Sequence, residues 1–150
     1  MEKLNYNNIK LKFINEEDDF SNLVKKGISF DEEGMCYNDV DDIDSYIEKV
    51  KNSFVVYGIY YGNELIGISM IGQVDSLDSD KFAISINIKK EYRGKKLASL
   101  LVHNLTVAIL EQEKIPFYSA SVTNIASQAV AIRSGYMPLW TDTFGTRDIC

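Results

Sequence analysis

The stretch EYRGKKLASLL, residues 91–101, predicts a helix whose beginning is unusual. Apolar residues recur at helical spacing from Leu97 onward, yet RGKK (93–96) stands where Ser, Thr, Asp or Asn usually caps a helix. The first turn of a helix has unpaired N–H groups and a partial positive charge, so lysines are not the residues expected there. We therefore expect the turn to bind a phosphate in place of a cap, with a solvated basic turn as the alternative.

The composition favours one globular domain over residues 1–150. A chain of 150 residues, 45% of them hydrophobic, can bury one core and is short for two. Residues 1–13 lack the apolar run of a signal peptide, and no stretch approaches the roughly 20 apolar residues of a membrane span, so we expect a soluble, cytoplasmic protein. The net charge of −6 argues against general nucleic-acid binding. Cys36 and Cys150 are expected to be free thiols, with neither a disulfide framework nor a metal site.

Hydrophobic periodicity predicts a mixed α/β fold. Strands are expected at residues 9–14, 54–61, 64–71, 81–88, 117–122 and within 136–144, and helices at 16–26, 43–50, 95–113 and 124–134. Gly62-Asn63 joins the clearest hairpin, and residues 75–80 are expected to form a loop. This order predicts a mixed sheet with helices on both faces, parallel only between the strand ending at Ile88 and the strand beginning at Phe117.

Two stretches around the turn carry a family resemblance. INIKKEYRGKKLASLLVHNL (86–105) followed by PFYSASVTNIASQAVAIRSGYMPLW (116–140) resembles the acyl-coenzyme A core of the GNAT superfamily of N-acyltransferases. The family's loop is Arg or Gln, two residues, Gly, one residue, then Gly or Ala. Arg93 and Ala98 match its ends, whereas Lys96 replaces its middle glycine. The resemblance, which covers most of the chain, implies a GNAT-like fold.

The resemblance also implies that acetyl-coenzyme A (acetyl-CoA) is the co-substrate. Main-chain N–H groups from about Gly94 to Ser99 would hold its pyrophosphate. The strand end at Ile86 to Ile88 would splay from its parallel neighbour and pair with the pantetheine arm, which Asn124 and Ser127 would contact near the thiol. The cofactor-binding residues so implied are Ile86, Ile88, Arg93, Gly94, Lys95, Lys96, Leu97, Ala98, Ser99 and Asn124.

The catalytic groups that the resemblance implies are incomplete in this sequence. The tyrosine that serves as general acid in many family members corresponds to Ala131. Ser127, the first candidate for catalysis, a water bound by it, or Tyr118 would then protonate the departing thiolate. The strand before the turn lacks the glutamate that often serves as base, so Asp80 or a carboxylate of the first two helices would act through water. His103 is expected to have a surface or structural role, because it lies between the apolar rows of its helix.

The acceptor is expected to bind between the early helices and the central hairpin. Residues 31–48 carry many carboxylates and no Lys or Arg, which favours a cationic amine such as a polyamine, an aminosugar or a basic peptide end. A solvated acidic loop is the alternative interpretation. The tyrosines that could line this cleft are Tyr37, Tyr46, Tyr57, Tyr60 and Tyr61.

Three functional hypotheses follow from these features. The first is an N-acetyltransferase that moves an acetyl group from acetyl-CoA to a primary amine of a small molecule or protein, by direct attack in a ternary complex. The second, favoured by Ala131, is a catalytically weak or inactive coenzyme A-binding sensor or interaction module. The third is a phosphate-binding domain without acyl chemistry. The short segment after Gly135 offers one good closing strand, so either the last strand is vestigial or a partner subunit covers the exposed sheet edge, and we expect a homodimer.

Overall fold

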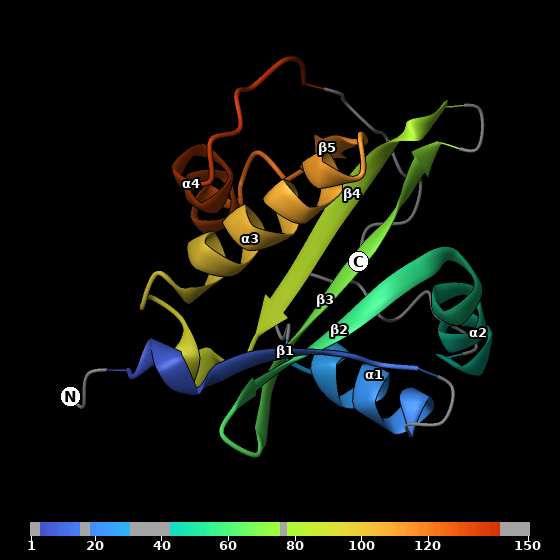
Figure 1. The fold of residues 1–150 in the computed structure, drawn as a ribbon, viewed down its shortest axis with the longest axis vertical. Coiled ribbons are helices and arrows are strands. Elements are labelled where there is room, and N and C mark those ends of the chain that lie inside the picture. Colours follow the sequence, from blue (N-terminus) through green and yellow to red (C-terminus); the bar gives the residue numbers. More distant parts are fainter. Residues whose placement is uncertain (1–3, 16–18, 31–42, 76–77, 142–150) are drawn as a thin grey trace.

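A five-stranded sheet lies between two pairs of helices in the computed structural model of the protein (Figure 1). The structure describes residues 4–15, 19–30, 43–75 and 78–141. Its elements in chain order are η1 (Tyr6–Asn8), β1 (Ile9–Phe13), α1 (Phe20–Ile28), α2 (Ile43–Ser53), β2 (Phe54–Tyr61), β3 (Glu64–Asp75), β4 (Asp78–Ile88), η3 (Lys90–Tyr92), α3 (Leu97–Glu111), β5 (Ile115–Phe117) and α4 (Ile125–Arg133). The strands lie side by side in sequence order, antiparallel except for the parallel pair β4–β5. The predicted mixed sheet with helices on both faces is confirmed.

The two faces of the sheet have separate hydrophobic cores. Helices α1 and α2 cover one face, where Val24 packs in the same core as Met70. Helices α3 and α4 cover the other face, where Val102 packs with Ile84. Met70 belongs to the first core and its neighbour Ile71 to the second, because successive strand side chains point to opposite faces. Each fully buried aliphatic side chain contributes roughly 1.5–3 kcal/mol of transfer free energy, so both helix layers are firmly attached to the sheet.

The β2–β3 hairpin turns at Gly62 and Asn63, as predicted. Gly62 has φ +59°, a conformation that glycine adopts without a steric penalty. The loop expected at residues 75–80 is wrong for Asp75 and for residues 78–80, because β3 reaches Asp75, which pairs with Asp78 at the start of β4, and residues 76–77 lie outside the described residues. Asp and Ser are poor strand formers, but here they extend a ladder that the buried parts of both strands have already established.

The last part of the chain departs from the predicted strands. Strand β5 (Ile115–Phe117) begins before the strand predicted at residues 117–122 and shares only Phe117 with it. After Phe117 the chain leaves β4, and Tyr118 hydrogen-bonds to helix α4. Of the strand expected within 136–144, residues 136–141 form no strand, and the remainder lies outside the described residues. Cys36 and Cys150 also lie outside them.

Strands β4 and β5 separate toward one end, which exposes main-chain groups. Their parallel pairing ends at Ala83, although β4 continues to Ile88. On the other side, the N–H of Lys89 donates to the carbonyl of Ile66 (2.8 Å). Alternate residues of β4, Ile86 and Ile88 among them, therefore direct their N–H and C=O groups away from β3. Beyond Ala83 these groups face an edge of β4 that β5 does not cover.

Candidate functional site

Helix α3 begins without a side-chain cap, as the sequence predicts. Its N-cap residue, Lys96, has φ 60° and ψ 9° and makes no side-chain capping hydrogen bond. At the helix start, Leu100 donates its N–H to the Lys96 carbonyl (3.2 Å). The N–H groups of Leu97, Ala98 and Ser99 therefore precede the helical hydrogen-bond ladder and point toward an external acceptor. With the helix dipole, these donors make the start of α3 suitable for an anion.

The turn before α3 is shaped by two left-handed residues, Gly94 (φ +72°) and Lys96. A Cβ at Gly94 would meet no heavy atom within 4 Å, so glycine suits this position because of its backbone conformation and not because of crowding. The ammonium of Lys95 lies 5.3 Å from the centre of the Tyr92 ring, and the Lys95 carbonyl accepts a hydrogen bond from Tyr6. Lys96 is exposed, so its charge stands in solvent beside the uncapped helix.

The Arg93 side chain binds main-chain carbonyls. Its Nε donates to the carbonyl of Ile88 (2.7 Å), and an Nη atom donates to the carbonyl of Phe30, just after α1. The guanidinium thus links the turn to the end of β4 and to the α1 layer. Since the Ile88 carbonyl already accepts this bond, Ile86 offers the less encumbered main-chain groups on the open edge of β4.

A hydroxyl pair lies next to the end of β5. Tyr118 directly follows β5, and its hydroxyl shares a hydrogen bond of 2.9 Å with the hydroxyl of Ser127 in the first turn of α4. Asn124 caps α4, because its Oδ1 accepts a hydrogen bond from the Ser127 N–H (3.0 Å). These contacts fix two hydroxyl groups close to the point where β5 separates from β4.

A second tyrosine packs against this pair. The rings of Tyr118 and Tyr136 lie 5.6 Å apart, and the Tyr136 hydroxyl shares a hydrogen bond of 2.7 Å with Thr106 on α3. Burial raises the pKa of Tyr136 above 10.0, although the hydrogen bond with Thr106 acts in the opposite direction. Tyr136 therefore stays protonated at neutral pH and holds the Tyr118 ring between α3 and α4.

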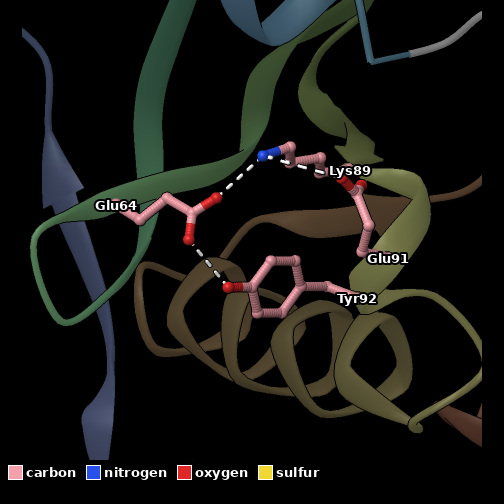
Figure 2. Close-up of polar contacts among 4 residues, drawn as sticks. All are labelled: Glu64, Lys89, Glu91 and Tyr92. Atoms are coloured by element: carbon pink, nitrogen blue, oxygen red, sulfur yellow. Dashed lines mark hydrogen bonds and ion pairs between the residues drawn. The ribbon is translucent and has the colours of Figure 1, made fainter.

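Beside the turn, one carboxylate binds two side chains. Glu64, at the start of β3, accepts hydrogen bonds from Lys89 Nζ and from the Tyr92 hydroxyl, both at 2.8 Å (Figure 2). Glu91 lies farther off, 3.8 Å from Lys89 Nζ. The hydrogen bond from Lys89, and then that from Tyr92, holds the pKa of Glu64 below its usual value. With Leu4, Tyr61 and Lys95, these four residues line a pocket of about 330 Å³ beside the turn.

Of the other candidate residues, Asp80 lies away from the open edge of β4 and His103 faces solvent. Asp80 pairs with Lys114 (2.9 Å) near the start of β5, at the end where β4 and β5 are joined. His103 is exposed on α3, which agrees with the surface role expected for it. Ala131 lies half-buried on α4, within the helix that carries Ser127.

The tyrosines expected to line one acceptor cleft lie on different faces of the sheet. Tyr46 packs on the core under α1 and α2, and burial raises its pKa. Tyr57 and Tyr61 pack on the cores under α3. Tyr37 lies outside the described residues, as do residues 31–42 of the acidic segment. Of the described acidic residues, Asp44 forms a surface ion pair with Lys25 (3.0 Å).

Sequence reasoning missed Glu64 and Tyr92 as parts of the site. The residues belong to separate elements, and only the pairing of β3 with β4 brings them together. No sequence spacing signals such a contact. Within the described residues there is no group of three or more His, Cys, Asp or Glu side chains that could hold a metal ion, and no helix long and apolar enough to cross a membrane.

The site therefore consists of an uncapped helix that follows a strand, and this strand separates from its parallel neighbour. The family model of GNAT acetyltransferases matches residues 8–139. The chain belongs to the GNAT acetyltransferase family. As a member of this family it is an acyltransferase, and the resemblance inferred from the sequence is confirmed. None of the curated proteins compared with this GNAT chain matches it.

Solved structures share the fold of this GNAT chain. One is an aminoglycoside acetyltransferase from an uncultured soil metagenomic sample, in complex with sisomicin, with a TM-score of 0.67 and 14% identity over 95% of this chain and 97% of that chain. Another is AAC(6')-Iy in complex with a bisubstrate analogue, CoA-S-monomethyl-acetylneamine, with a TM-score of 0.67 and 14% identity over 94% and 99%. A third is a predicted acetyltransferase with acetyl-CoA from Clostridium acetobutylicum, with a TM-score of 0.64 and 18% identity over 91% and 96%. At these identities the likeness concerns the fold.

Proposed function

We propose that this protein transfers an acetyl group from acetyl-CoA to a primary amine, by direct attack within a ternary complex. The observation that carries the proposal is the uncapped start of α3 beside the open edge of β4, in a chain of the GNAT acetyltransferase family. The helix start offers N–H donors for a pyrophosphate, and the strand edge offers main-chain partners for the amide groups of a pantetheine arm. Structural neighbours bound to acetyl-CoA or to a bisubstrate analogue of coenzyme A support this choice of co-substrate.

The residues around the turn would divide the binding of acetyl-CoA among them. The N–H groups from Gly94 to Ser99 would hold the pyrophosphate, and Lys96 would add its charge. On β4, Ile86 would pair with the pantetheine arm. Ile88 would take part through its N–H, because its carbonyl already binds Arg93. Asn124 would contact the arm through its amide nitrogen, since its oxygen caps α4.

In the proposed reaction, the amine nitrogen attacks the thioester carbonyl carbon. A C–N bond forms, the C–S bond breaks, and the departing thiolate takes up a proton while the nitrogen releases one to solvent. We assign the thiolate's proton to the Tyr118–Ser127 pair. A phenol is a stronger acid than an aliphatic hydroxyl, because its ring delocalises the negative charge left after proton loss, so we take Tyr118 as the donor and Ser127 as the group that orients it.

For the acceptor, we propose a small cationic amine. The net charge of −6 and the acidic segment 31–48 favour a positively charged ligand. One structural neighbour is an aminoglycoside acetyltransferase bound to sisomicin, and another, AAC(6')-Iy, is bound to a bisubstrate analogue that contains acetylneamine. A protein amine remains within the proposed reaction type, since the same attack applies to any neutral primary amine.

The second candidate function is a coenzyme A-binding module with weak or no turnover. It is favoured by Ala131, which cannot supply a proton. Release of free thiol from acetyl-CoA, measured against a panel of polyamines, aminoglycosides and lysine-bearing peptides, distinguishes the two. Turnover with any of these amines supports the enzyme. Binding of acetyl-CoA without turnover on the whole panel supports the binding module.

A further inference from the structure

The carboxylate of Glu64 binds two residues that lie shortly before the turn preceding α3. Glu64 binds Lys89 through one oxygen and Tyr92 through the other, at 2.8 Å each (Figure 2). Lys89 ends the β4 ladder through its bond to Ile66, and Tyr92 closes the short helix η3. The two oxygens of Glu64 therefore clamp both ends of η3, immediately before the turn that carries Gly94 and Lys96.

We propose that Glu64 is a positioning residue for acetyl-CoA binding, which presets the turn so that the N–H groups at the start of α3 face the pyrophosphate. This inference rests on the function proposed above. Glu64 itself would touch no atom of acetyl-CoA. It acts through Tyr92 and Lys89, which fix the path of the chain into the turn.

The clamp adds to the contacts that Arg93 and Tyr6 make at the turn, and the backbone of the turn itself has little rigidity. Gly94 has more backbone freedom than any other residue type, and Lys96 occupies a conformation that lysine seldom adopts. A turn left free to move would lose conformational entropy when it ordered around a phosphate, and this loss would weaken binding. Tyr92 is itself held by two further contacts. Its ring packs 5.8 Å from that of Tyr61 and lies beneath the ammonium of Lys95.

Electrostatics and positioning predict opposite effects when Glu64 is replaced. The carboxylate lines the same pocket as Lys95 of the turn, so by Coulomb's law alone its removal would make acetyl-CoA, which is negatively charged, bind more tightly. If Glu64 positions the turn, its removal weakens binding instead. The sign of the change in Kd therefore distinguishes the two effects.

The experiment is a calorimetric titration with acetyl-CoA of the wild type and of three variants, Glu64→Ala, Tyr92→Phe and Glu91→Gln. We expect Glu64→Ala to raise Kd by about threefold to tenfold, the range of one or two partly exposed polar contacts. Tyr92→Phe removes one hydroxyl and no charge, so it should raise Kd in the same direction. Glu91→Gln is the control, because it removes one carboxylate charge from η3 and leaves both hydrogen bonds of Glu64 in place, so it should leave Kd unchanged or lower it.

Turnover and thermal unfolding complete the test. With an amine that is acetylated, Glu64→Ala should raise the KM for acetyl-CoA while kcat at saturating acetyl-CoA stays within about twofold of the wild type.

A lowered Tm with an unchanged Kd would overturn the inference, as would a Kd for Glu64→Ala equal to or below that of the wild type. If Glu64→Ala does not fold, the charge-neutral Tyr92→Phe decides by the same criterion. Absence of binding by the wild type would overturn the proposed function as well, whereas normal wild-type binding with unaffected variants would overturn this inference alone.

Discussion

The hydroxyl groups of Tyr118 and Ser127 lie 2.9 Å apart and join the end of β5 to the first turn of α4. The contact joins the phenol of Tyr118, at the point where β5 leaves β4, to α4, the helix whose Ala131 cannot donate a proton. The proton donor that we propose for the thiolate thus comes from the strand end and not from the helix position of Ala131.

Replacing Tyr118 with Phe should lower kcat by about 100-fold, because general acid catalysis typically contributes roughly 10²–10⁴-fold. Ser127→Ala should lower kcat less, since it removes only the partner that orients the phenol. In both variants the Kd for acetyl-CoA should change by less than about twofold, because the pyrophosphate site is untouched.

Tyr136→Phe serves as the control for these rates. The ring of Tyr136 packs on Tyr118, but its hydroxyl is bonded to Thr106 on α3. Loss of this hydroxyl should therefore leave kcat within about twofold of the wild type. Thiol release measured at saturating acetyl-CoA decides the assignment. Wild-type turnover in Tyr118→Phe would exclude Tyr118 as the acid.

Lys96→Gly should raise the free energy of unfolding by about 0.5–1 kcal/mol, because glycine relieves the left-handed strain at φ 60°. Lys95→Gly removes the same charge one residue earlier, where φ is not positive, and should lower the free energy of unfolding. Denaturant unfolding of both variants measures the difference. If both changes destabilise the protein equally, strain at Lys96 is not significant.

Two buried serines should respond oppositely to replacement by alanine. Ser69 in β3 is fully buried, and its hydroxyl has no hydrogen-bond partner among the described residues. Ser134 donates to the carbonyls of Val130 (2.8 Å) and Ser99 (3.2 Å). Ser69→Ala should leave the free energy of unfolding unchanged or raise it by up to about 1 kcal/mol, whereas Ser134→Ala should lower it by about 1 kcal/mol. A clear loss of stability in Ser69→Ala would mean that its hydroxyl has a partner.

Stability in acid should depend on Glu64. Its pKa is lowered by the hydrogen bond from Lys89 and then by that from Tyr92, so its deprotonated form is favoured more in the folded state than in the unfolded chain. This contribution to stability is present above pH 4.5 and is lost as the pH falls through the lowered pKa. The Tm difference between the wild type and Glu64→Gln should therefore shrink from pH 7 to pH 3. A difference that stays constant over this range would contradict the assignment.

The sequence predicts features whose causes are local. The uncapped start of α3 follows from RGKK standing in place of a cap, and the β2–β3 turn follows from Gly62-Asn63. The contact of Glu64 with Tyr92 depends on the register of β3 against β4, which spacing along the chain does not reveal. The loop motif likewise marks Arg93 but not its side-chain direction, which depends on the carbonyls of Ile88 and Phe30.

The length of β5 illustrates the same limit. FYSASV has the composition of a strand throughout, but only residues up to Phe117 pair with β4. The hydrogen bond between Tyr118 and Ser127 then takes the chain toward α4. Local propensity thus predicts that a strand exists, whereas tertiary contacts determine where it ends.

Calorimetric titration of the wild-type protein with acetyl-CoA, with ATP and the Lys96→Glu variant as controls, tests most directly whether the start of α3 holds the pyrophosphate. We expect acetyl-CoA to bind with a Kd at least about tenfold lower than that of ATP, since ATP has phosphates but no pantetheine arm to pair with β4. Lys96→Glu should raise the Kd for acetyl-CoA, and this effect should diminish at high salt. Absence of acetyl-CoA binding, or equal binding of ATP, would contradict the proposed site.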